Sequence, residues 1–144
     1  MSLIKSIPED TKRIKKACKA CPYSKSVTPG ATGGSHPDVY VGQGHGPFYL
    51  PCHKTCDFSD PDWKTDVDTP QQCAGAAIYR SNIGRGKLMP PMLHILPPDD
   101  SVFHSPEELL AHHLQVSTEV AAAYLKNNTP EQLMQREFQR AMVA

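Results

Sequence analysis

The chain has few of the residues that build a large hydrophobic core. Hydrophobic residues make up 39% of its 144 residues, aromatic residues make up 7%, and Trp occurs once. Its 14 prolines and 9 glycines predict long loops, because neither residue favours the interior of a helix or strand. A small core with long loops leaves little stability to spare, so the composition favours a domain stabilised by a cross-link or a metal.

Long apolar runs and an excess of one charge are also missing. No run approaches the roughly 20 apolar residues that cross a bilayer, and the N-terminal stretch MSLIKSIPEDTKRIKK lacks the apolar centre of a signal peptide. We therefore predict a cytoplasmic protein with no membrane partner. The 15 basic and 15 acidic residues balance, so no overall field attracts nucleic acid.

The charges are nevertheless unevenly distributed along the chain. Residues 1–26 contain seven Lys or Arg against two acidic residues, whereas residues 57–68 contain five Asp and a single Lys. Two solvated faces explain this pattern most simply, and a basic patch that binds a partner is the alternative. The candidates for nucleic-acid contact in that patch are Lys12, Arg13, Lys15 and Lys16.

The N-terminal half predicts little regular structure. Residues 17–70 are rich in Gly, Pro, Asp and Ser and show no sustained period, so we predict mostly loop, with short strands at 38–41 and 47–52. A helix is predicted over 69–87, because Thr69 suits its N-cap and Pro70 its first position. That helix would end at Gly84 or Gly86 and would place Cys73 in its first turn.

Helix signals are clearer in the C-terminal third. Ser105-Pro106 and Thr129-Pro130 each combine a hydroxyl cap with a proline suited to the first helical position, and acidic or amide residues follow. Ser117 or Thr118 caps a further helix between them. We predict three short helices at about 106–115, 118–127 and 130–142.

These signals predict a mainly α protein with long loops and few short strands, a small α+β fold with four or five short helices. Its N-terminal half is loop-rich and centred on a metal, and its C-terminal tail has three helices. The segments of this one compact domain are a basic arm at 1–16, a cysteine-rich region at 17–87, a proline-rich connector at 88–104 and a helical region at 105–144.

Five cysteines are concentrated in that loop-rich region. Cys18 and Cys21 form a C-x-x-C pair, Cys52 and Cys56 bracket CHKTC, and Cys73 opens CAGAAIY. In a cytoplasm such thiols favour metal binding over a disulfide framework, and thiolates are strong ligands for zinc and for iron–sulfur clusters. We therefore predict a metal centre. The alternatives are a thioredoxin-like redox pair at C-x-x-C and unrelated free thiols.

The identity of the metal is more finely balanced. Four cysteines suit both tetrahedral zinc and a [4Fe–4S] cluster. Pro22 directly after Cys21, and ligands spread over 55 residues, favour the cluster. The second close pair of cysteines, together with His53 as a nitrogen ligand, favours zinc. The sequence makes the [4Fe–4S] cluster the first prediction and Zn²⁺ the alternative.

Three blocks of the cysteine-rich region resemble a family of small phage and actinobacterial proteins catalogued as a domain of unknown function. The blocks are CKACPYSKS, PFYLPCHKT and CAGAAIYRSN, within residues 17–85. The resemblance implies a phage origin, and so a place in the host cytoplasm or the virion. It implies that the ligands are Cys18, Cys21, Cys52 and Cys73 and that His53 belongs to the site. The chain departs from the pattern at Tyr23 and Ser24, where Trp and Arg are expected, and in the additional Cys56, an alternate ligand.

A second motif lies at residues 109–125, whose pattern resembles a helix-turn-helix. Gln115 stands where the turn usually has glycine, and Lys126 is the only basic residue of the would-be recognition helix. An ordinary helical hairpin is therefore the preferred interpretation, because few side chains there could contact phosphates or bases. His113 is predicted to be a packed residue rather than a catalytic base.

Three functions follow from these patterns. The first is a small phage-type metal-binding protein that holds a [4Fe–4S] cluster through four cysteines, with a structural, redox or sensing role. The second is a zinc-stabilised adaptor or nucleic-acid-binding protein that uses the basic arm and the helical tail. The third, less favoured, is a metalloenzyme in which His53 performs acid–base chemistry. The sequence predicts a protein or nucleic-acid partner without identifying it.

Overall fold

The computed structural model describes residues 21–50, 73–90, 93 and 95–143. In these ranges the protein is mainly helical, and their one β pairing is an isolated antiparallel bridge between Ser24 and Val102. The predicted fold class, mainly α with a helical C-terminal tail, is confirmed. The elements are α3 (Asp38–His45), α4 (Ala74–Asn82), the short 3-10 helix η2 (Gly86–Leu88), α5 (Pro106–Leu114), α6 (Thr118–Asn127) and α7 (Pro130–Val143).

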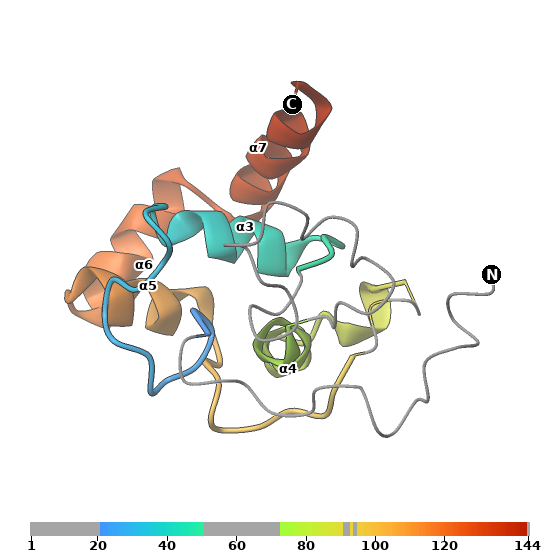
Figure 1. The fold of residues 1–144 in the computed structure, drawn as a ribbon. Coiled ribbons are helices and arrows are strands. Elements are labelled where there is room, and N and C mark those ends of the chain that lie inside the picture. Colours follow the sequence, from blue (N-terminus) through green and yellow to red (C-terminus); the bar gives the residue numbers. More distant parts are fainter. Residues whose placement is uncertain (1–20, 51–72, 91–92, 94, 144) are drawn as a thin grey trace, which may run out of the picture.

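Helix α3 lies at the centre of the arrangement. It packs against α7 on one side and also contacts α4 and α5. Helices α5 and α6 form a hairpin beside one end of α3, and α7 extends away from the rest with the C-terminus at its far end (Figure 1). Helix α3 thus lies between α4 and the C-terminal helices. No helix in the described ranges has the length and apolar character needed to cross a membrane.

The hydrophobic core joins the cysteine-rich region to the helical tail. It gathers side chains from the loop after Cys21, from α3 and α4, and from all three C-terminal helices. Its buried members are Cys21, Tyr23, Val41, Ala76, Ile78, Tyr79, Val102, Phe103, Leu109, Leu110, Ala121, Leu125 and Leu133. Because the core is shared, the two halves of the chain stabilise each other.

The C-terminal helices begin where the sequence predicts. The Ser105 hydroxyl accepts a hydrogen bond from the Glu108 N–H at 3.1 Å, and the Ser117 hydroxyl accepts one from the Val120 N–H at 3.1 Å. Thr129 forms the same cap on α7. These caps satisfy amide donors that a first helical turn leaves without a partner. Two apolar residues of these helices, Leu114 and Val120, are exposed.

The strand predicted at 38–41 is wrong, because these residues begin helix α3. Val39, Tyr40 and Val41 favour a strand in isolation, but packing against α7 overrides that preference. A Cβ atom added to Gly42 would come within 2.6 Å of the Leu133 carbonyl oxygen, so the two helix backbones are in close contact there. The second predicted strand, at 47–52, is not formed over residues 47–50, and residues 51 and 52 lie outside the described ranges.

The helix predicted over 69–87 is shorter, and Cys73 is its N-cap rather than a residue of its first turn. Thr69 and Pro70 lie outside the described residues. The helix ends as predicted before Gly84, whose φ of 78° is a left-handed conformation that glycine adopts without strain.

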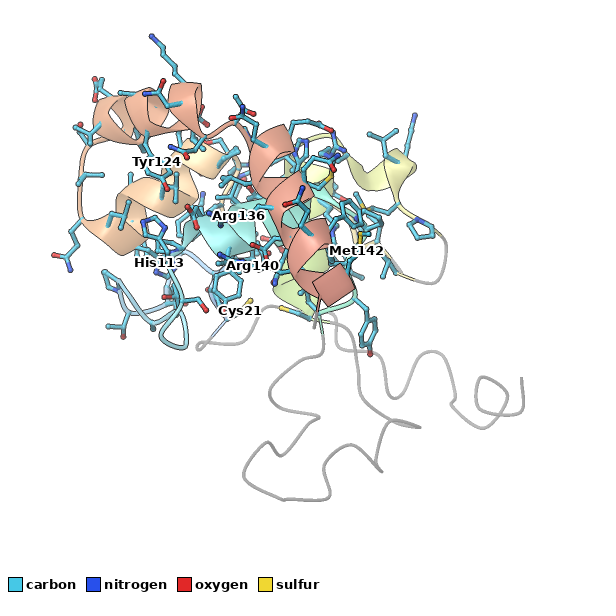
Figure 2. The ribbon with its side chains drawn as sticks, turned by 90° about the horizontal axis from the view of Figure 1, so that it is seen from above. Cys21, His113, Tyr124, Arg136, Arg140 and Met142 are labelled. Carbon is cyan, nitrogen blue, oxygen red and sulfur yellow. The ribbon has the colours of Figure 1, made fainter. Side chains whose placement is uncertain are left out.

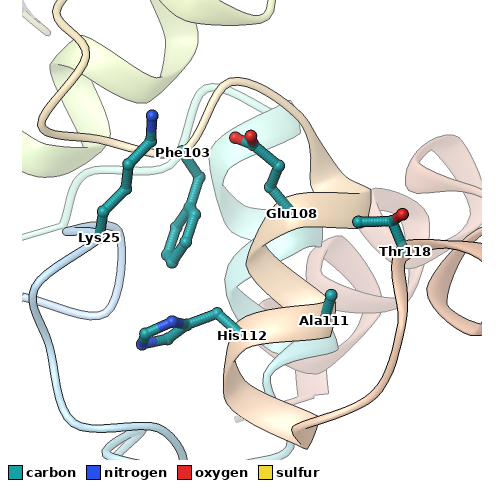
Figure 3. A pocket seen from close by; sticks show the side chains of 6 residues that line it. All are labelled: Lys25, Phe103, Glu108, Ala111, His112 and Thr118. Carbon is teal, nitrogen blue, oxygen red and sulfur yellow. The ribbon is translucent and has the colours of Figure 1, made fainter.

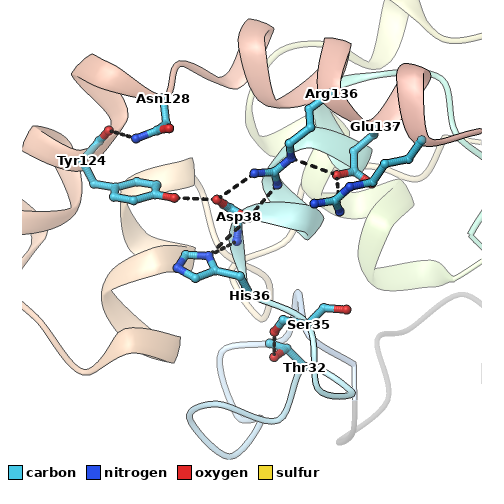
Figure 4. Close-up of polar contacts among 9 residues, drawn as sticks. Thr32, Ser35, His36, Asp38, Tyr124, Asn128, Arg136 and Glu137 are labelled. Atoms are coloured by element: carbon cyan, nitrogen blue, oxygen red, sulfur yellow. Dashed lines mark hydrogen bonds and ion pairs between the residues drawn. The ribbon is translucent and has the colours of Figure 1, made fainter.

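A buried carboxylate fixes α3 against the C-terminal helices (Figure 4). Asp38 is 3% exposed. Its oxygens accept hydrogen bonds from the Tyr124 hydroxyl at 2.5 Å and from the Arg136 guanidinium at 2.7 Å. Burial alone would raise the pKa of Asp38, but these two donors, with a smaller effect from His36, hold the pKa below its ordinary value. The charged form of Asp38 therefore stabilises the fold.

The buried side chain of His113 in α5 links the loop after Cys21 to the helical tail. Its Nε2 donates to the Pro22 carbonyl at 2.8 Å, and its Nδ1 accepts from the Gly30 N–H at 3.1 Å. Figure 2 shows His113 on α5, beside the loop that leads from Cys21. Both bonds together require the neutral ring. Burial lowers the pKa of His113, and the neighbouring His112 lowers it further, although the bond to Pro22 opposes this. The predicted role of a packed residue is confirmed.

One buried hydroxyl has no partner. In the described part of the chain, the Tyr79 Oη is the only buried side-chain polar atom without a hydrogen bond. The adjacent Tyr23, whose ring centroid lies 4.9 Å from that of Tyr79, donates its hydroxyl to the Tyr40 carbonyl at 2.7 Å. The two rings share one environment but differ in whether the hydroxyl is satisfied.

We expect Asp38→Asn to lower the free energy of unfolding by about 2 kcal/mol, because the buried position 38 then holds a neutral amide in place of the carboxylate that binds Tyr124 and Arg136. The value allows for solvent screening, since the Arg136 side chain is 35% exposed. Urea unfolding followed by circular dichroism measures this. Asp100→Asn is the matched control, since Asp100 pairs with His104 on a side chain that is 96% exposed, and its loss should leave stability unchanged. Equal stability of the two variants would contradict the role given to Asp38.

The lowered pKa of His113 predicts that stability falls in mild acid. The unfolded state takes up a proton below pH 6.5, whereas the folded state resists protonation until a lower pH, so stability present above pH 6.5 is lost as the pH falls through that window. Unfolding free energies measured from about pH 8 to pH 5 should show this decline in the native protein. His113→Gln should make the decline less steep, leaving the contributions of His45 and Cys73, whose pKa values are also lowered. Parallel curves of unfolding free energy against pH for the two proteins would contradict this role of His113.

Tyr79→Phe should leave stability unchanged or raise it by about 1 kcal/mol, because it removes a buried hydroxyl that has no partner. Tyr23→Phe, in the same cluster, should cost about 1 kcal/mol, since it deletes a satisfied hydrogen bond. Thermal and urea unfolding of the pair measure the difference. The opposite order of stabilities would show that the Tyr79 hydroxyl has a stabilising contact.

Candidate metal centre

Two cysteines that are 52 residues apart in sequence meet in the structure. The Sγ atoms of Cys21 and Cys73 lie 3.3 Å apart, and neither residue is in a disulfide. Cys21 is 3% exposed, and Cys73 packs against the same core. The predicted convergence of thiols from separate blocks is therefore observed for the two cysteines that the structure describes. We refer to Cys21 and Cys73 as the thiol pair.

The fold stabilises a thiolate at Cys73. The pKa of Cys73 is lowered to about 7, chiefly by the hydrogen bond from Cys21. Burial opposes this shift, whereas the backbone N–H groups of Ala76 and Gly75 at the start of α4 add to it, as does the charge of Arg80. A helix N-terminus favours negative charge because its first amide groups point outward. A deprotonated sulfur is also what metal coordination requires.

Tyrosine rings share the hydrophobic core of the thiol pair. Tyr23 is 1% exposed, and its ring meets Tyr40 edge-on at a centroid distance of 5.9 Å. Burial raises the pKa of Tyr23, and the negative charge of both cysteines adds to that rise, as it does for Tyr40. The sulfurs and the rings belong to or pack against one hydrophobic core, and a poorly solvated environment of this kind strengthens electrostatic interactions.

A buried arginine lies two helical turns beyond Cys73. Arg80 is 0% exposed, and its guanidinium donates to the carbonyl oxygens of Gly44 at 3.2 Å and Phe48 at 2.7 Å. It also donates to those of Gln43 at 2.9 Å and Gly46 at 3.0 Å. These bonds hold the segment between α3 and Leu50 against α4. The Leu50 carbonyl in turn accepts the Cys73 N–H at 2.6 Å.

The other predicted site residues lie outside the described residues. These are the ligand candidates Cys18 and Cys52, the alternates Cys56 and His53, and the basic candidates Lys12, Arg13, Lys15 and Lys16. Among the described residues, no group of three or more His, Cys, Asp or Glu side chains is placed to hold a metal. The thiol pair is thus the described part of the predicted ligand set.

The helix-turn-helix candidate forms a hairpin of α5 and α6. Gln115 occupies the left-handed conformation that ends α5, with φ 56° and ψ 48°, where glycine is usual. The exposed surface of α6 carries Glu119, Val120 and the single basic residue Lys126. The hairpin itself was predicted, and this surface adds no cluster of positive charge that would favour DNA.

A shallow pocket of about 310 Å³ lies beside α5 and the start of α6 (Figure 3). Lys25 and Glu108 stand near its rim, and the Phe103 ring forms part of its wall. His112 also lines it, but the Nε2 of this ring donates to the Val27 carbonyl at 2.6 Å. The pocket therefore offers one lysine and one glutamate of opposite charge. Its histidine is already hydrogen-bonded to the backbone of the loop at Val27.

Sequence reasoning missed Arg80. The residue is the only charged one in the helix AGAAIYRSN, and a lone charge among small and apolar residues is the signal that could have singled it out. Its partners are carbonyl groups, which every residue carries, so the sequence does not indicate which segment it binds.

Comparisons of the chain with family models, with curated proteins and with solved structures find no match. The resemblance to the phage and actinobacterial family stays a prediction, and the site is interpreted from its own geometry.

Proposed function

We propose that this is a metal-binding protein in which Cys18, Cys21, Cys52 and Cys73 hold one metal centre that orders the loop-rich half of the chain. The observation that carries this proposal is the 3.3 Å separation of the sulfurs of Cys21 and Cys73, which come from distant blocks of sequence. Two soft donors this close, one of them favoured as a thiolate, form half of a tetrahedral ligand set.

Sequence separation supports the other two ligands. Cys52 is two residues beyond Leu50, whose carbonyl oxygen lies 2.6 Å from the Cys73 nitrogen. Two peptide units span at most about 7.6 Å. Cys18 is three residues before Cys21, the spacing of a C-x-x-C pair. The chain is therefore short enough on both sides for these thiols to reach the same centre.

The distance between the two sulfurs favours a single ion. Zinc–sulfur bonds of about 2.3 Å in a tetrahedral arrangement place two ligand sulfurs about 3.8 Å apart, compared with 3.3 Å in the thiol pair. In a [4Fe–4S] cluster each cysteine binds a different iron, which holds the sulfurs farther apart. We therefore place zinc ahead of the [4Fe–4S] cluster that the sequence favours, and the cluster is the second candidate because of Pro22 after Cys21.

The role of the centre is most simply structural. The described loops of this half, residues 21–37 and 46–50, contain little regular structure, and a centre that joins three blocks of sequence would restrict all of them. When bound, the metal supplies a cross-link whose binding free energy contributes directly to folding. Redox and sensing roles belong to the cluster alternative. The nucleic-acid and metalloenzyme alternatives rest on Lys12, Arg13, Lys15, Lys16 and His53, and stay predictions.

Protein purified without oxygen should carry one metal centre per chain, and Cys21→Ser or Cys73→Ser should remove most of it. Elemental analysis for zinc and iron measures this, and the absorption spectrum separates a colourless zinc protein from a brown cluster. Because metal binding is coupled to folding, a strong chelator should also lower the thermal midpoint of the native protein.

The additional cysteine provides the matched control. Cys56→Ser should retain the metal, whereas Cys18→Ser and Cys52→Ser should lose it, which tests the fourth ligand by the same measurement. Stoichiometric metal in both Cys21→Ser and Cys73→Ser would exclude the proposed centre. Loss of metal in Cys56→Ser together with retention in Cys52→Ser would instead assign the ligand to Cys56.

A further inference from the structure

The bonds of Arg80 connect two of the cysteine blocks. Its guanidinium binds the carbonyl groups of Gln43, Gly44, Gly46 and Phe48. The same segment continues to Leu50, whose carbonyl accepts the Cys73 N–H. Arg80 and Cys73 belong to one helix and its cap, seven residues apart, so they lie on nearly the same helix face, about 10 Å apart along the axis. One side chain therefore fixes how the segment before Cys52 lies against the helix that begins after Cys73.

Arg80 also brings a positive charge into the environment of the thiols. Its side chain is 0% exposed, and it lies in the helix whose N-cap is Cys73. Charges interact strongly in such a poorly solvated region.

Four thiolates leave a metal centre with excess negative charge, because a divalent ion neutralises only half of them. Burying such a centre is costly unless positive charge or hydrogen-bond donors lie nearby. Arginine suits this position, since it stays charged when buried and its planar fork binds several oxygens at once.

We propose that Arg80 is a positioning residue of the metal centre: its charge offsets the negative charge of the thiolates, and its fork holds the segment from Gln43 to Leu50 against Cys73. This inference rests on the proposed function. It predicts that metal affinity depends on Arg80, although Arg80 is not itself a ligand.

The test measures the affinity of the full chain for Zn²⁺ by competition with a chromophoric chelator under reducing conditions. Arg80→Met, which removes both charge and fork, should weaken binding about 10- to 100-fold, as expected when a group that supports metal ligands is lost. Arg80→Lys keeps the charge without the fork and should recover part of the affinity. Wild-type affinity in both variants would overturn the inference.

Arg85→Met is the matched control. Arg85 also donates to a carbonyl at the end of α3, that of His45 at 2.7 Å, so its loss tests whether detaching this region is enough to weaken the metal. Binding at wild-type affinity in Arg85→Met supports a specific role for Arg80, whereas equal weakening in both Met variants overturns it.

The outcomes also separate the two proposals. If the native protein binds no zinc and no iron, both fail, whereas tight binding that ignores Arg80 removes only the role of Arg80. If Arg80→Met does not fold, Arg80→Lys decides. A folded Lys variant with measurably weaker zinc binding supports the inference, and one with native affinity overturns it.

Discussion

The approach of Cys21 to Cys73 is the contact on which the organisation of the N-terminal half depends. Their sulfurs, 3.3 Å apart, join a loop that has little regular structure to the start of a buried helix. Two further contacts bring a third segment to the same place, since Leu50 accepts the Cys73 N–H and Arg80 binds the residues before Leu50. Ordering loops costs conformational entropy. Because the hydrophobic core of this chain is small, the contacts among these three segments help to offset that cost.

The parts of the fold that the sequence predicted are those specified by neighbouring residues. Ser105, Ser117 and Thr129 each cap a helix by bonding an amide three residues ahead, so the signal and its structural effect lie within one turn. The end of α4 at Gly84 is equally local. Burial is less local: Leu114 and Val120 are apolar but exposed, because which side of a helix is covered depends on neighbours from elsewhere in the chain.

Helix α3 shows why the rest could not be predicted. Its sequence DVYVGQGH contains residues that favour strands and glycines that favour neither state. It becomes a helix because Asp38 binds Tyr124 and Arg136, and because Gly42 allows the backbone of Leu133 to approach. These partners lie 86 to 98 residues away. No pattern within a short window records such contacts, so tertiary packing decides the conformation.

The candidate site likewise contains residues that the sequence predicted and a residue that it did not. Cysteine spacing indicated Cys21 and Cys73 because thiols are rare and their chemistry is specific, but Arg80 left no comparable trace, since it recognises backbone carbonyls. Yet the arginine and the thiolate stabilise each other. A buried guanidinium favours a nearby anion, and a thiolate at Cys73 favours a nearby cation, so removing either raises the cost of burying the other. A metal that keeps the thiols deprotonated would preserve this pairing, whereas two neutral thiols would lose it.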